Sequence, residues 1–174
     1  LSVESDEIGN LFITKGEAEL YPCIAAHLDE IHSPCERTVI IEGNRIFTVD
    51  RLWNHVGCGA DDKNGLWVII NLLHSEPILK VALFVQEERT GDIAGCRGAR
   101  ACDLSFFNDV KFVLECDRKG SSDVVSIGKD ELVLCHQDFI PQGILRRYGY
   151  EMVKGGKTDV VELKSLLSYR CISN

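Results

Sequence analysis

Three short, almost wholly apolar runs punctuate the sequence and limit its fold more than any other feature. They span residues 20–26, 81–86 and 110–116. A strand that is apolar along its whole length is usually buried on both faces, as in a parallel sheet that helices cover. We therefore predict an α/β fold, a three-layer sandwich whose mostly parallel central sheet is covered by helices on both faces.

The segments around these runs predict the remaining elements. Residues 38–49 hold two β-rich runs around Gly43-Asn44, which predicts a hairpin. Residues 64–74 carry too many apolar side chains for a surface helix and predict a helix packed on the sheet. Further helices are predicted at 93–102, 138–148 and 158–167, weaker strands at 124–127 and 131–135, and a last strand at 168–173.

Length and charge narrow the class of protein. The 174 residues are enough for one domain with a sizeable core, so we expect a single catalytic domain over residues 1–174. The net charge of −8 argues against nucleic acid or an anionic membrane as the partner, because both need clustered Lys and Arg. No apolar run approaches the roughly 20 residues of a membrane span, and no signal peptide is visible. We expect both ends to be truncated.

The eight cysteines contain no Cys-x-x-Cys pair, and several lie within apolar runs. They are typical of small buried hydrophobes in a reducing compartment, which predicts a cytoplasmic protein. A zinc site made of cysteines is not expected.

Each apolar run ends in residues that bind cations or move protons. In open α/β sheets the ligand site lies beyond the carboxyl ends of the strands, so these residues should meet in one crevice. A divalent cation would relieve the repulsion between their carboxylates; the mixed imidazole and carboxylate set suits zinc, with manganese or cobalt possible. The residues are His27 and Asp29 after the first run, Asp61 and Asp62 in the loop before the apolar helix, Glu87 and Glu88 after the second run, and Asp117 after the third.

Each element also has an ordinary structural interpretation. Asp61 or Asp62 could cap the following helix, and Asp117 beside Arg118 could form a surface ion pair that contributes little stability. The combination of four such elements in this order favours the metal site.

These elements resemble the di-zinc exopeptidases, which include bacterial tripeptidase (peptidase T), aminopeptidases and acetylornithine deacetylase. The resemblance covers the chain from about residue 20 onward. It rests on Ala26-His27-Leu28-Asp29, the Gly-Ala-Asp-Asp-Lys-Asn-Gly loop at 59–65, Glu87-Glu88, the segment 95–99 and Asp117.

The resemblance implies a role for each residue. His27 and Asp117 would bind one zinc ion, Glu88 would bind a second, and Asp61 would bridge the two. Asp29 would orient the His27 imidazole as a supporting catalytic residue. Glu87 would be the general base, and Asp62 is not expected to bind metal. In the family, the peptide bond after the bridging aspartate is cis.

One departure from the family lies at the carboxyl end. The second zinc ion normally takes a histidine just after the last strand, and the sequence ends at Asn174 without it. Residues 155–160 resemble the Gly-Thr-Asp element that precedes that strand, so the histidine is expected beyond Asn174. Only about forty residues separate Asp117 from this element, too few for the lid domain of many relatives.

We therefore expect a zinc-dependent exopeptidase that hydrolyses short peptides, of the aminopeptidase or tripeptidase type, with a metal-activated water. One or two ions are expected, and a homo-oligomer is possible. A deacylase of N-acyl amino acids and a catalytically inactive metal-binding domain are the alternatives.

Overall fold

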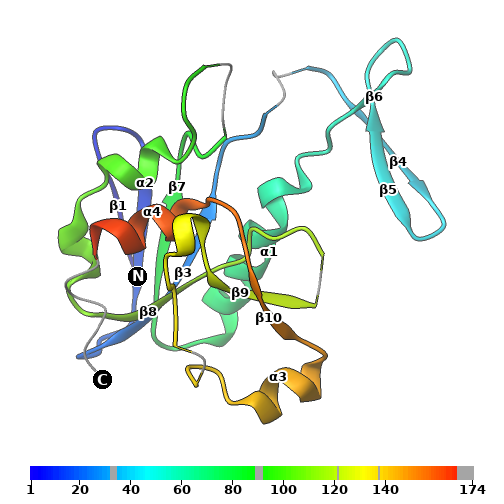
Figure 1. Cartoon of the computed structure of the whole chain (residues 1–174). Helices are drawn as coiled ribbons and strands as arrows, with labels where there is room; N and C mark the ends of the chain where they lie inside the picture. Colours follow the sequence, from blue (N-terminus) through cyan, green and yellow to red (C-terminus); the bar gives the residue numbers. More distant parts are fainter. Residues whose placement is uncertain (32–34, 89–91, 121, 137, 168–174) are drawn as a thin grey trace.

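The computed structural model describes residues 1–167 except 32–34, 89–91, 121 and 137 (Figure 1). Its central sheet has five strands in the spatial order β1-β2-β7-β3-β8. The predicted last strand at 168–173 lies outside the described residues. The strands are β1 (Ser2–Ser5), β2 (Leu11–Lys15), β3 (Tyr21–His27), β7 (Leu79–Phe84) and β8 (Val110–Glu115).

Helices cover both faces of this sheet, as predicted. Successive side chains of β3 point to opposite faces. Cys23 and Ala25 belong to a buried cluster that includes Ala99, Phe107 and Leu163. Ile24 and Ala26 belong to a second cluster, in which they pack with Ile69 of the long helix α1 and with alternate residues of β7. The covering helices are α1 (Ala60–Ser75) on one face and α2 (Arg97–Ala101), η1 (Leu104–Phe107) and α4 (Asp159–Leu166) on the other.

The prediction of a mostly parallel sheet is wrong, because the sheet is mixed. Strand β3 runs parallel to both β7 and β8, but β2 pairs antiparallel with β7, and β1 pairs antiparallel with β2. β1 and β2 need only a short turn between them, whereas a parallel connection needs a crossover of a dozen residues or more. All four residues of β1 are exposed, so this edge strand lacks the apolar run that marks the central strands.

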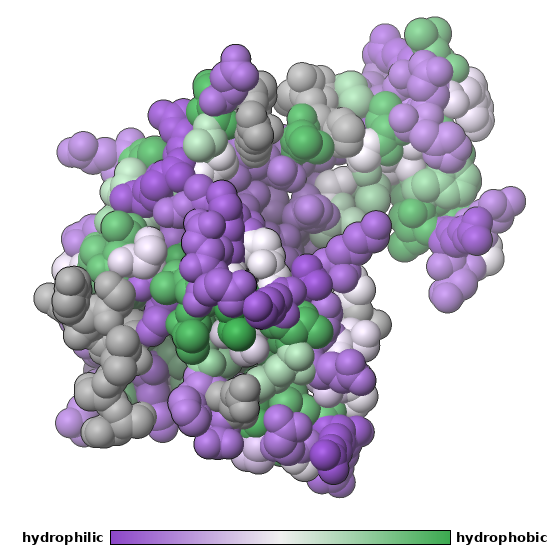
Figure 2. Space-filling view, viewed as in Figure 1, coloured by the Kyte–Doolittle hydropathy of each residue, from purple (hydrophilic) through white to green (hydrophobic). Residues whose placement is uncertain are grey.

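The predicted hairpin at 38–49 is confirmed, and it belongs to a separate antiparallel sheet. This sheet consists of β4 (Thr38–Glu42), β5 (Arg45–Val49) and β6 (His55–Val56). It projects away from the central sheet, and apolar side chains gather on it (Figures 1 and 2).

The segment after β8 forms a small unit beside the central sheet. Its two strands, β9 (Asp123–Ile127) and β10 (Glu151–Lys154), pair in parallel. Between them lie η2 (Lys129–Glu131) and α3 (Gln142–Tyr148). The strand predicted at 131–135 is reduced to one bridge between Ile127 and Val133, and β10 was not predicted.

Three predicted helices are shorter than expected. Glycines and prolines set several of the boundaries: α2 begins only after Gly95, and α3 begins after Pro141, which has no backbone N–H to donate within a helix. Within the described residues, no helix is both long and apolar enough to cross a lipid bilayer.

Candidate functional site

The carboxyl ends of the three parallel strands meet at one edge of the central sheet. In the register, His27 at the end of β3 lies opposite Phe84 at the end of β7, and Ala25 lies opposite Glu115 at the end of β8. The residues that follow each strand, Glu87 and Asp117 among them, are therefore brought to the same edge. The placement expected from the sequence is observed.

The imidazole of His27 is fixed between two oxygen atoms. The residue is 1% exposed. Its Nδ1 lies 2.9 Å from the backbone carbonyl oxygen of Asp29, and its Nε2 lies 2.8 Å from Oδ1 of Asp61. Because a carbonyl oxygen only accepts hydrogen bonds, the first contact places a proton on Nδ1. Nε2 is then the atom that faces the site.

The loop that opens α1 turns Asp61 and Asp62 in different directions. The Asp61–Asp62 peptide bond is cis, as the resemblance implied. The Asp61 side chain is 67% exposed and reaches His27, whereas Asp62 is buried. Oδ1 of Asp62 accepts a hydrogen bond of 2.9 Å from the N–H of Gly65, just after the non-helical backbone at Asp61 and Asp62 near the start of α1. A Cβ atom at Gly65 would lie 2.4 Å from the Asp62 carboxylate, which explains the glycine there.

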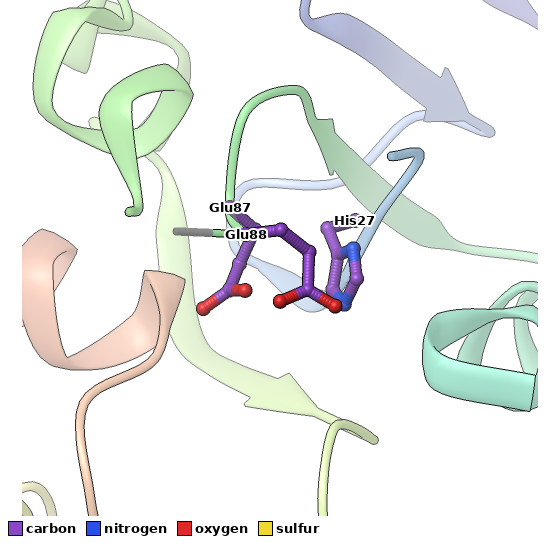
Figure 3. A group of neighbouring side chains, drawn as sticks. All are labelled: His27, Glu87 and Glu88. Atoms are coloured by element: carbon purple, nitrogen blue, oxygen red, sulfur yellow. The ribbon is translucent and has the colours of Figure 1, made fainter. Parts of the chain in front are cut away.

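Asp29 supports the acidic pair by a route that differs from the expected one. Its carboxylate accepts hydrogen bonds from the backbone N–H groups of Glu87, at 3.0 Å, and of Glu88, at 3.1 Å. The same carboxylate is 3.8 Å from Nδ1 of His27, so the backbone carbonyl makes the closer contact with the ring. Asp29 thus links the loops after β3 and β7. Figure 3 shows Glu87 and Glu88 leaving one loop on the same side as the His27 ring.

Two groups of side chains have donor atoms close enough to share a cation. One group is His27, Asp61 and Asp117, and the other is His27, Glu87 and Glu88; within each, the donor atoms lie within 4.8 Å of one another. His27 is common to both groups among the described residues. The bridging role of Asp61 and the separate role of Glu87 as a base remain predictions.

Burial and mutual repulsion hold protons in this site. Burial, helped by the charges of Glu115 and Asp61, raises the pKa of Asp117 to about 8. Burial and the neighbouring carboxylates also raise the pKa of Glu88. For His27, burial opposes protonation, but the hydrogen bond to Asp61 and the charge of Asp117 prevail and raise its pKa.

Two acidic residues behind the site had no predicted role. Asp159, at the start of α4, is fully buried, and neither carboxylate oxygen has a hydrogen-bond partner among the described residues. Burial raises the pKa of Asp159 to about 9. Burial also raises the pKa of Glu115 to about 7, against the smaller opposing effect of its hydrogen bonds. The only sequence signal for Glu115 is a charged residue at the end of an apolar run.

The donor set fits a divalent cation. Nε2 of His27 and Oδ1 of Asp61 are both acceptors when His27 is neutral, so a proton or a cation must lie between them. Asp117 brings a second carboxylate to the same point. One imidazole nitrogen with carboxylate oxygens is a ligand set that zinc accepts.

Solved structures that align with this chain include peptidases. A tripeptidase from Staphylococcus aureus aligns with a TM-score of 0.59 at 20% identity, over 73% of this chain and 36% of its own. The TET1 peptidase of Pyrococcus horikoshii, which can assemble into a tetrahedron or a large octahedral shell, aligns with a TM-score of 0.57 at 14% identity, over 94% and 78% of the two chains.

An aminoacylhistidine dipeptidase from Vibrio alginolyticus aligns with a TM-score of 0.54 at 17% identity, over 71% of this chain and 27% of its own. The chain thus spans about a third of the tripeptidase and about a quarter of the dipeptidase. No protein-family model and no curated protein matches the sequence. The resemblance to the exopeptidases is confirmed at the level of the fold.

Proposed function

We propose that this chain carries the catalytic centre of a metal-dependent exopeptidase that hydrolyses short peptides, of the aminopeptidase or tripeptidase type. The observation that carries this proposal is the pairing of His27 Nε2 with Asp61 at 2.8 Å, with Asp117 in reach and Glu87 and Glu88 beside it. The fold shared with a tripeptidase and a dipeptidase supports the peptide substrate.

His27, Asp61 and Asp117 would hold one ion, and Asp61 and Glu88 a second. Zinc suits this set best, with manganese or cobalt as alternatives. A divalent cation at this position supplies polarisation of the scissile carbonyl and a lower pKa for the attacking water. Asp29 keeps Nδ1 of His27 protonated through its backbone carbonyl and leaves Nε2 free to bind.

Glu87 is the residue that moves the proton. It accepts a proton from the attacking water at a carboxylate oxygen and delivers that proton to the leaving amine. Asp29 accepts a hydrogen bond of 3.0 Å from the backbone N–H of Glu87, which holds the backbone of the proposed base in place after β7. Adjacent Glu87 and Glu88 thereby divide proton transfer and ion binding between them.

The test compares two variants of the acidic set. Glu87→Gln should lower kcat by about 10²-fold or more and keep the metal content, because a base contributes about that much to rate. Asp61→Asn should lose metal as well as activity. Hydrolysis of a free tripeptide is compared with its N-acetylated form, and metal is measured by mass spectrometry. Equal metal loss in both variants would show that Glu87 is a ligand, and preference for the acetylated substrate would favour a deacylase.

We extend the proposal to self-association, because the TET1 peptidase assembles into shells. The projecting β4-β5-β6 sheet carries exposed apolar side chains that a second copy could cover, which are Val39, Ile41, Ile46, Leu52 and Trp53. Light scattering should give a mass above that of one chain, and Ile41→Lys with Ile46→Lys should reduce it. A single-chain mass for the unmodified protein would contradict this extension.

A further inference from the structure

The segment that follows the acidic pair folds back onto it. Three backbone hydrogen bonds join the two stretches: Cys96 N–H to the Glu87 carbonyl at 2.7 Å, Arg97 N–H to Gln86 at 2.9 Å, and Gly98 N–H to Val85 at 3.0 Å. Cys96 has a φ of 56°, a conformation that non-glycine residues rarely adopt. The backbone of Glu87 is therefore held on both sides, by Asp29 at its N–H and by Cys96 at its carbonyl.

The side chain of Cys96 makes a second contact with the same residue. Its thiol donates a hydrogen bond of 3.2 Å to Oε1 of Glu87. Cys96 is 1% exposed, so water does not compete for either group on that side. Burial and the charge of Glu87 raise the pKa of the thiol, so it remains an S–H donor.

We propose that Cys96 is a positioning residue for Glu87: its thiol holds the carboxylate in one rotamer beside His27 and Glu88. The inference rests on the proposed role of Glu87 as the base. A thiol is a weak donor, so it orients the carboxylate with little loss of basicity, whereas a charged donor would bind the carboxylate more strongly and weaken it as a base. Asp29 contacts only the backbone of Glu87, so it does not restrain the side-chain torsions of that residue.

The kinetic test uses three variants of buried cysteines. Cys96→Ala should lower kcat about tenfold or more with KM unchanged, because a misaligned base slows only the chemical step. Cys96→Ser, which restores a hydroxyl donor, should recover most of that loss. Cys102→Ala is the matched control: Cys102 is also buried, and its thiol contacts the carbonyl of Ala99 instead. Metal content should equal that of the unmodified protein in all three.

Two kinetic results and one measurement of metal content would overturn the proposal. They are a kcat for Cys96→Ala equal to that of Cys102→Ala, a serine variant no better than the alanine variant, and a loss of metal that accompanies the loss of rate. The last result would make Cys96 part of ion binding.

An infrared measurement tests the contact without any activity. The S–H stretching band of Cys96 is obtained from the difference between the unmodified protein and Cys96→Ala. We expect it at lower frequency than that of an exposed thiol, and Glu87→Gln should shift it upward because a neutral amide accepts less strongly than a carboxylate. A band that Glu87→Gln leaves unchanged would refute the contact. Inactive unmodified protein would instead refute the proposed function, and the infrared result would still decide the role of the thiol.

Discussion

At the scale of single residues, the site holds protons that a cation must displace. Asp117 has a pKa of about 8, and the pKa of His27 is raised by its hydrogen bond to Asp61. Asp117 therefore carries a proton at pH 7, and the hydrogen bond to Asp61 favours the protonated form of His27; ligation requires that Asp117 lose its proton and that Nε2 of His27 carry none. We expect zinc binding at pH 7 to release about one proton from Asp117, and affinity to fall about tenfold per released proton for each pH unit below 7.

Calorimetric titrations in buffers of different ionisation enthalpy count these protons. Asp117→Asn should lower the count by about one, since the amide has no proton to lose. Glu36→Gln is a control, because Glu36 is exposed and pairs with Arg51 away from the two groups of ligands. Binding without proton release would contradict the arrangement of His27 and Asp117.

The sequence alone located the ligand candidates because each follows an apolar strand or opens an apolar helix. It could not show how they are held. The carboxylate of Asp29 was expected to orient His27, but the backbone carbonyl of Asp29 makes that contact. A contact made by the backbone cannot be deduced from the type of residue. Cys96 contacts Glu87 across nine residues, and the burial of Asp159 results from packing that the sequence does not display.

At the scale of elements, one buried side chain joins three parts of the fold. Asn10, which is fully buried, donates from Nδ2 to Asp6 at 2.7 Å and to the Gly98 carbonyl at 3.0 Å. Its Oδ1 accepts the N–H of Val85 at 3.0 Å. Asn10→Ala should lower the free energy of unfolding by roughly 2–5 kcal/mol, because it leaves buried backbone groups without partners.

Urea denaturation measures this loss, with Asn54→Ala as the control. Asn54 is exposed and bonds only locally to Asp50, so its replacement should cost less than about 1 kcal/mol. Similar losses in the two variants would show that Asn10 does not join these elements. Two of its three partners are 75 and 88 residues away, which is why no local pattern singled it out.

At the scale of elements, the sequence predicted the central strands most clearly where both faces of the strand are buried. β3, β7 and β8 carry continuous apolar runs because helices cover both of their faces. The edge strand β1 is exposed throughout, and β10 has two exposed residues of four, so neither has a comparable signal. The direction of β2 depends on its pairing with β7, and a single-strand pattern does not encode direction.

At the scale of the whole molecule, burial and neighbouring carboxylates make three acidic groups at the site hold protons more tightly in the folded state than in the unfolded chain. The net charge is −8, and Asp117, Glu115 and Asp159 have pKa values raised to about 8, 7 and 9. These values lie above the values of about 4 in an unfolded chain. Protein prepared without metal should therefore lose stability as the pH rises from about 4 towards 9, because the folded state must give up protons that it binds more tightly.

A bound cation should reverse that loss. Zinc at about 100 times its dissociation constant adds about 2.7 kcal/mol, which corresponds to a rise in Tm of about 5–10 °C for a chain of this size. At one fixed zinc concentration the rise in Tm should be larger at pH 8 than at pH 6, because fewer protons compete for the site at the higher pH and the dissociation constant is lower. Magnesium should give a smaller rise, since it prefers six oxygen ligands and gives up its water reluctantly. Asp61→Asn combined with Asp117→Asn should abolish the zinc effect; an equal rise in that double variant would show that zinc binds elsewhere, with the cysteines as the next candidates.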